Sequence, residues 1–233
     1  MEKCGRHRPD TPTLKEFILC GNYQLDHRGF VALTKVIPHN VEHWNMSYCD
    51  MSEYQTLATL QELNVQCNDA TCPPTLTALT LQGAKMCNED ACEALAHLLN
   101  MNRSLVRITI DDPKYPLPSL STSLLAILVE GLQYNYGLTQ LQLNLSPLGQ
   151  QQRTNRRRYT TATSLRQALE EERTVRDTLD FYLELNRAGR KILQDEHHHD
   201  RHQMLQAIQK ARLSSRRLDV LYWLIRNSLE DWF

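Results

Sequence analysis

Long apolar runs are missing from this 233-residue sequence, although 41% of its residues are apolar. No run approaches the length of a membrane-spanning helix. The first segment, MEKCGRHRPDTPT, is polar, so we expect neither a signal peptide nor an anchor. Glycine is scarce, with 8 residues, and no glycine-rich loop follows an expected strand. These absences favour an intracellular, cytoplasmic globular protein that contacts no membrane and needs no cofactor.

Catalytic signatures are also missing. The sequence has no H-E-x-x-H, no G-x-S-x-G, no P-loop and no Ser-His-Asp order, so we expect no enzyme. The sequence has seven cysteines, an odd number, and its first segment does not resemble a secretion signal. We therefore expect all seven to be reduced thiols.

Two groups of residues raise the question of a metal. Cys67 with Cys72 and Cys87 with Cys92 form C-x₄-C pairs, which are wider than the usual C-x₂-C zinc knuckle. Small buried apolar side chains are the preferred interpretation of these cysteines. The run HHHDRH, residues 197–202, can place His198 and His202 one helical turn apart. Adjacent histidines cannot all face one ion, so a polar loop or helix start is preferred and no metal site is expected.

Charge divides the chain into two parts. Residues 1–150 carry 10 Lys and Arg against 15 Asp and Glu, whereas residues 151–233 carry 16 against 12. The seam is GQQQRTNRRRYT, which we interpret as an exposed loop; a nuclear import signal at Arg156–Arg158 is the alternative. A net charge of −1 argues against a chain that wraps nucleic acid. The expected parts are a polar tail (1–12), a repeat region (13–149), a basic linker (150–160) and a C-terminal region (161–233).

One short pattern recurs along the repeat region: a small residue, Leu, two variable residues, an apolar residue, a variable residue and another apolar residue. The copies are TLKEFIL at 13, TLQELNV at 59, TLTALTL at 75, SLVRITI at 104 and GLTQLQL at 137, with NVEHWNM at 40 as a looser sixth. The lead residues are spaced by 27, 19, 16, 29 and 33 positions. Repetition at such periods is typical of solenoid proteins, although a doubly wound α/β fold also alternates strands with helices.

The pattern resembles the L-x-x-L-x-L core of leucine-rich repeats of the ribonuclease-inhibitor type. That resemblance implies an α/β fold: a right-handed, curved parallel sheet of about six short strands with helices on its convex side. Asp26, Asn88 and Ser121 are expected helix caps. The short interval containing CPP leaves little room for a helix, so the middle repeats are expected to be poor in helix.

The C-terminal region follows another pattern. Leu179, Phe181, Leu183 and Leu185 alternate, which favours a short strand over 179–185 ending at Asn186, with a helix as the alternative. Helices are expected near 205–211 and 218–229. The ending FYLELNRAGR…DVLYWLIRN is similar to the tail of short intracellular leucine-rich-repeat proteins of microalgal type, so we expect a mainly helical cap over 161–233.

Residues that flank the repeat leucines should project from the concave face, because side chains alternate along a strand. They are rich in amides and poor in charge, which suits a protein partner; a merely solvated face is an equally weighted alternative. We expect a non-catalytic interaction scaffold or, as the alternative, a regulator of an enzyme or small GTPase, with Arg107 as the single arginine on that face. Asn45, Asn64, Thr80, Thr109 and Gln142 should form one continuous polar row. The candidate partner-binding residues are Glu16, His43, Asn45, Glu62, Asn64, Gln66, Thr80, Gln82, Arg107, Thr109, Asp111, Gln140, Gln142 and Asn144.

Overall fold

A five-stranded parallel sheet and seven helices make up the part of the chain that this computed structural model describes, namely residues 14–36, 41–67, 75–86, 88–110, 122–143, 162–190, 201–214 and 216–229. The strands are β1 (Leu14–Ile18), β2 (Val41–Asn45), β3 (Ala78–Thr80), β4 (Arg107–Thr109) and β5 (Gln140–Gln142). The helices are α1 (His27–Val36), α2 (Glu53–Cys67), α3 (Glu89–Met101), α4 (Thr122–Gln133), α6 (Ala162–Ala188), α7 (Arg201–Ala211) and α8 (Arg217–Leu229).

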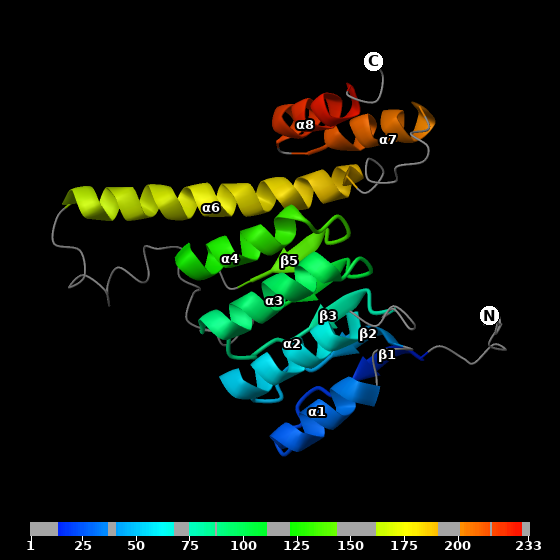
Figure 1. Ribbon diagram of the computed structural model, residues 1–233, viewed down its shortest axis with the longest axis vertical. Helices are drawn as coiled ribbons and strands as arrows, with labels where there is room; N and C mark the ends of the chain where they lie inside the picture. The colour runs from blue at the N-terminus through cyan, green and yellow to red at the C-terminus, as the bar shows by residue number, and fades with distance from the viewer. Residues whose placement is uncertain are drawn as a thin grey trace, which may run out of the picture.

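Strand order in the sheet follows chain order, and every neighbouring pair is parallel. Helices α1 to α4, which connect the strands, contact one another in the same order and lie side by side along one face of the sheet (Figure 1). Each strand with its following helix therefore forms one unit packed against the previous unit. We call β1–β5 with α1–α4 the strand–helix stack.

The core lies between the sheet and these helices. Trp44 of β2, Leu79 of β3 and Ile108 of β4 pair with one another in register and are fully or almost fully buried. Leu95, Leu98 and Leu99 of α3 join the same cluster from the helix side, and the remainder of the core is similarly apolar. The repeated leucines thus bury one side of each strand, as their spacing predicts.

Five of the six expected strands are present, and the strand expected over residues 59–65 is wrong. Residues 59–65 belong to α2, where Leu60 and Leu63 are buried but Val65 is 65% exposed. A capping box begins this helix: the Ser52 amide donates to Gln55 Oε1 (2.9 Å) and the Gln55 amide donates to Ser52 Oγ (3.3 Å). The middle of the stack is therefore not poor in helix. Of the expected caps, Asp26 accepts from Gly29 and Asn88 from Ala91, and Ser121 lies outside the described residues.

The C-terminal region contains helices where a strand was preferred. Residues 179–185 lie within the 27-residue helix α6, so the expected strand is wrong, as is a capping role for Asn186 at a new helical turn. The alternating leucines mislead because Leu179 and Leu183 are one helical turn apart and face α4, whereas Leu185 faces the other way, into a second cluster with α7 and α8. The helices expected near 205–211 and 218–229 are confirmed as α7 and α8.

Two expected segments, 1–12 and 150–160, lie outside the described residues, so those domain boundaries stay predictions. Within the described residues, no helix is long and apolar enough to cross a membrane.

Candidate functional site

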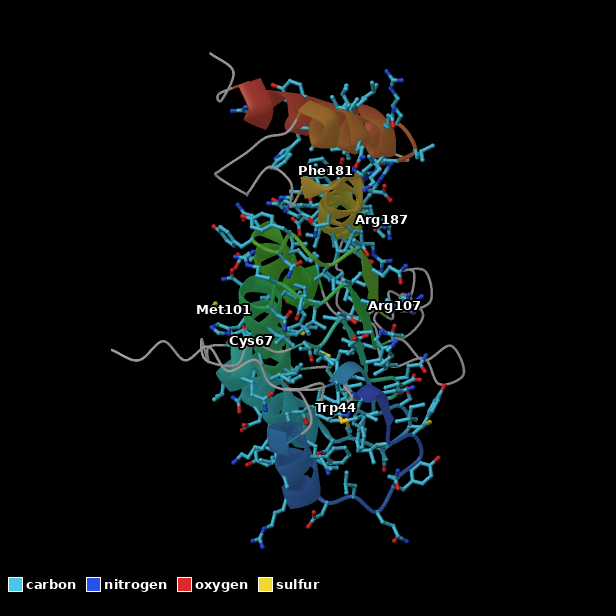
Figure 2. The ribbon with its side chains drawn as sticks, turned by 90° about the vertical axis from the view of Figure 1, so that its right-hand side faces the viewer. Trp44, Cys67, Met101, Arg107, Phe181 and Arg187 are labelled. Carbon is cyan, nitrogen blue, oxygen red and sulfur yellow. The ribbon has the colours of Figure 1, made fainter. Side chains whose placement is uncertain are left out.

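The sheet presents one face away from helices α1–α4, which we call the open face. Strand pairing aligns its side chains in two rows that cross all five strands. Figure 2 shows the two layers from the side, with Arg107 on the sheet side and Cys67 and Met101 on the helix side. The first row is Glu16, His43, Ala78, Arg107 and Gln140, and the second is Ile18, Asn45, Thr80, Thr109 and Gln142.

Polar groups on the open face are linked to their neighbours across the strands. Arg107 Nε donates to Gln140 Oε1 over 2.6 Å, and Thr109 Oγ1 donates to Gln142 Oε1 over 3.3 Å. His43, Arg107, Gln140 and Gln142 are exposed, whereas Ala78 at the middle of the first row has only a methyl group. The side chains of the first row therefore project least at Ala78, which lies between the longer, exposed side chains of His43 and Arg107.

The second row continues past the end of β2 through a small hydrogen-bonded group. Asn45 Oδ1 accepts from the Ser47 amide (2.9 Å) and lies 2.6 Å from Ser47 Oγ, which is also 3.3 Å from Gln82 Oε1. Beyond them the sheet-like backbone pairing persists, because the Tyr48 amide donates to the Gln82 carbonyl. Gln82 thus lies beside the strand ends, as expected from its position in the repeat.

Three candidate residues are not on the open face, because they belong to α2. Asn64 Nδ2 donates to the Ala94 carbonyl oxygen of α3 (2.9 Å), and Gln66 Nε2 donates to the Thr34 carbonyl oxygen of α1. Both side chains are buried and join adjacent helices. Glu62 lies on the same helix. Thr80 pairs directly with Asn45, so the place between them that Asn64 was expected to occupy does not exist, and Ile18 of β1 ends the second row.

Several other candidates lie outside the described residues: Asp111, Asn144, Arg156–Arg158, Cys72, Cys87 and the histidines 197–199. The described part of the chain contains no group of three His, Cys, Asp or Glu side chains arranged to hold a metal. Burial raises the pKa of the Cys49 and Cys67 thiols above the ordinary value, and their hydrogen bonds oppose that shift in part.

A chain of polar side chains at the helix ends was missed by the sequence analysis. Asn102 Nδ2 donates to Cys67 Sγ (3.3 Å), and Asn135 Nδ2 donates to the Asn102 carbonyl oxygen (2.9 Å). Asn186 Nδ2 donates to the Asn135 carbonyl oxygen (3.0 Å). The signal was present as NRSL and NYGL, in which an asparagine stands three residues before Leu105 and Leu138. We call Cys67, Asn102, Asn135 and Asn186 the helix-end chain.

The end of α6 closes the last unit of the stack through three polar side chains. Besides Asn186, Arg187 Nε donates to the Thr139 carbonyl oxygen (2.8 Å), and Arg190 Nη2 donates to that of Gln133 at the end of α4. Gly189, with a φ of 99°, ends the helix in the left-handed conformation that glycine favours and precedes Arg190.

Arg190 is almost completely buried among aromatic rings. Its guanidinium carbon lies 4.6 Å from the ring centre of Tyr136 and 5.2 Å from those of Tyr182 and Trp223. Burial lowers the pKa of this guanidinium, and the tyrosines oppose the shift. Because the rings come from the stack, α6 and α8, this arginine joins three parts of the fold.

Comparison with known proteins finds limited similarity. No family model and no curated protein matches the sequence. Among solved structures, the chain is similar to a Caenorhabditis elegans tropomodulin C-terminal domain, with 15% identity, a TM-score of 0.46, and coverage of 71% of this chain and 87% of that one. It is also similar to the leiomodin-1 actin-binding site 2, with 12% identity, a TM-score of 0.47, and coverage of 73% and 87%. At these identities and TM-scores, neither similarity assigns a function to this chain.

Proposed function

We propose that the chain is a leucine-rich-repeat solenoid, right-handed and curved, whose open face is concave and binds another protein. In this proposal the protein is a non-catalytic interaction scaffold. The candidate residues are the exposed and half-buried members of the two rows together with Gln82, because Ser47 and Thr109 are buried. Solenoids expose a long sheet face because each unit packs only against its neighbours.

The observation that carries the proposal is the alignment of the two rows. Five strands bring polar side chains to equivalent positions about 4.8 Å apart, the ordinary spacing of paired strands. Amide and hydroxyl groups both donate and accept, so such a row supports hydrogen bonds to a polypeptide in several registers. Because Ala78 has a short side chain between His43 and Arg107, a projecting side chain of the partner can be accommodated at this position.

The chemistry of the face favours binding over catalysis. Arg107 has its Nε engaged by Gln140, which holds the side chain along the sheet rather than projecting it as a GTPase-activating arginine would need. The described side chains with clearly shifted pKa values, such as Cys67, Asp180 and Arg190, belong to different elements, and their shifts arise chiefly from burial. We therefore infer a scaffold rather than an enzyme.

Site-specific photocrosslinking tests the proposal. A benzophenone amino acid is placed at Gln140 on the open face or at Val65 on the helix side, and both proteins are irradiated in cell lysate. We expect a protein adduct from position 140 and none from position 65. The double change His43→Glu and Arg107→Glu should remove the adduct. Binding energy is concentrated in a few central residues, and replacing one of them costs about 2 kcal/mol or more of binding free energy.

A matched control separates this surface from a general effect of charge. The double change Lys35→Glu and His97→Glu also replaces one cationic side chain and one histidine, and both residues are exposed on the helix side. It should leave the adduct unchanged, and both double variants should keep the thermal midpoint. An adduct formed only from position 65 would contradict the proposal. So would an adduct that survives the His43 and Arg107 changes and disappears when Arg156–Arg158 are changed.

A further inference from the structure

The α7–α8 hairpin, residues 201–229, stands apart from the strand–helix stack. Its main contacts are with α6, through a separate cluster that includes Leu185, Ala207, Val220 and Leu224. Figure 1 shows the hairpin on the side of α6 opposite to α4. Because α6 already closes the last unit of the stack, the stack does not need the outer side of the hairpin for its own packing.

That outer side carries some of the most exposed apolar side chains of the described residues. Leu213, in the turn between the helices, is 89% exposed, and Leu218 and Tyr222 of α8 are 73% and 67% exposed. Val220 and Leu224 are fully buried on the opposite side of α8, so Leu218 and Tyr222, one helical turn apart, share its outward face. The turn and α8 thus project apolar groups away from the body of the protein.

The same segment is strongly basic. Residues 201–229 contain six Lys and Arg and a single acid, Asp219, although the whole chain has a net charge of −1. Lys210, Arg212 and Arg226 are exposed, and Arg216 is paired with Asp177 of α6 (2.6 Å). We call Lys210, Arg212, Leu213, Leu218, Tyr222 and Arg226 the hairpin outer surface.

We propose that the hairpin outer surface docks on a membrane surface rich in anionic phospholipids, with Leu213 and Leu218 entering the interface. Basic residues near a bilayer attract anionic headgroups, and a few inserted apolar groups add affinity without spanning the membrane. The flexible stems of Lys210 and Arg212 let their charges remain at headgroup level beside the inserted leucines. Tyr222 suits the same region, where its ring is buried and its hydroxyl stays wet.

Shape favours a lipid surface over an acidic protein. Leu213, the most exposed of the apolar residues in the described ranges, lies in a turn, and Leu218 and Tyr222 project from the outward face of one helix. A protein partner gains affinity from close complementary packing, whereas a bilayer accepts single projecting side chains. A second copy of the chain is disfavoured, because two hairpins with this excess of positive charge repel one another.

Vesicle sedimentation with the full-length chain tests the proposal. The probes are phosphatidylcholine vesicles with and without phosphatidylserine, at low and at raised salt. We expect binding that requires phosphatidylserine and weakens as salt increases. The double change Leu213→Gln and Leu218→Gln should abolish binding. Lys210→Gln and Arg212→Gln should each weaken it about fivefold at low salt. Because all four side chains are exposed, the thermal midpoint should not change.

Matched controls lie on the helix side of the stack. Val65→Gln removes an exposed apolar group and Lys35→Gln removes an exposed charge, and both should bind vesicles normally. Equal binding to both kinds of vesicle would overturn the proposal, as would binding that survives the two leucine changes and is lost when Arg156–Arg158 become glutamine. Two further results would also overturn it: salt-sensitive binding to poly-L-glutamate without vesicle binding, which would indicate an acidic protein, and self-association that Leu218→Gln abolishes.

Discussion

Asn186 of α6 donates its side-chain amide to the backbone oxygen of Asn135, which lies two residues beyond the end of α4. Asn135 makes the same kind of bond to Asn102, one unit earlier in the stack. Helix α6, the next described element after β5, offers the last unit the hydrogen bond that a further repeat would offer. The stack is thus closed by the same interaction that joins its units, supplied from a helix 51 residues along the chain.

The first prediction concerns Asn135. Its Nδ2 donates to the carbonyl oxygens of Leu99 (2.6 Å) and Asn102, and its Oδ1 accepts from the amides of Gly137 (3.0 Å) and Leu138 (2.7 Å). Asn135→Ala leaves these buried backbone groups without partners, so the free energy of unfolding should fall by at least about 3 kcal/mol. Urea denaturation measures the loss.

The control for this change is Asn22→Ala. Asn22 also donates its side-chain amide to a backbone oxygen, that of Leu19, but it is exposed and water can replace the bond. Its replacement should cost no more than about 0.5 kcal/mol. Equal losses at the two sites would show that burial of the helix-end chain adds nothing.

Sequence spacing was enough to locate five strands and most helices of the stack. Leu79 and Ile108 lie at strand centres as the repeated pattern predicts. The pattern failed at Leu60 and Leu63, because two apolar residues three apart also suit one face of a helix. The deciding signals were local: the SEYQ capping box before α2 and the solvent-exposed Val65 that a strand would have buried.

The candidate site was only partly predictable for a related reason. Asn45, Thr80, Thr109 and Gln142 were placed in one row because each follows the central apolar residue of its strand. Once the false strand is removed, the row loses Asn64 from its interior, and Asn45 pairs directly with Thr80. The part played by Asn186 depends on contacts formed only when α6 crosses the stack, and no local pattern encodes them.

The second prediction tests the corrected strand assignment. Leu79→Ala and Ile108→Ala each leave a cavity beneath the sheet and should destabilise the protein by about 2 to 5 kcal/mol. Val65→Ala should change stability by no more than about 0.5 kcal/mol, because this side chain is mostly exposed on α2. Chemical denaturation of the three variants checks both expectations. A loss at Val65 as large as at Leu79 would restore the strand.

The third prediction concerns the contact between α3 and α4 at Gly131. A Cβ atom at this position would lie 2.5 Å from the Ala96 carbonyl oxygen and 2.7 Å from the Ala96 Cα. Alanine normally stabilises a helix interior by about 1 kcal/mol over glycine, but this backbone contact cannot yield without moving a helix. We expect Gly131→Ala to lower the thermal midpoint, with a cost of about 1 to 3 kcal/mol.

Gly29→Ala in α1 provides the comparison, because the nearest atom to its added Cβ is the flexible Leu25 Cδ1 at 2.9 Å. This change should be close to neutral. A higher midpoint for Gly131→Ala would mean that α3 and α4 are not in such close contact.

The fourth prediction concerns thiol reactivity. Cys20 is exposed, whereas burial raises the pKa of Cys49 and Cys67 and so lowers the fraction of reactive thiolate near neutral pH. In the native protein, iodoacetamide should modify Cys20 first, and the rates at Cys49 and Cys67 should rise as the pH is increased above the ordinary thiol range. Mass spectrometry locates the modified sites. After denaturation, titration should find all seven thiols; tightly retained zinc would contradict that count.

The last prediction concerns Arg190, which is 5% exposed and contacts Gln133 of α4, Tyr182 of α6 and Trp223 of α8. Arg190→Met keeps the apolar stem but removes the hydrogen bond to Gln133 and the ring contacts. The loss is partly offset, because Arg190 Nε is buried without a partner among the described residues. We therefore expect a net cost of about 1 to 3 kcal/mol in the free energy of unfolding.

Hydrogen exchange of the Arg190→Met variant should accelerate in α7 and α8, while α1, α2 and α3 keep their protection. Arg190→Lys should not rescue the defect, since lysine lacks the planar fork that meets both the carbonyl and the rings. Arg212→Met, an exposed control, should leave exchange unchanged. Equal acceleration in all helices would instead place Arg190 among the residues that hold the whole stack together.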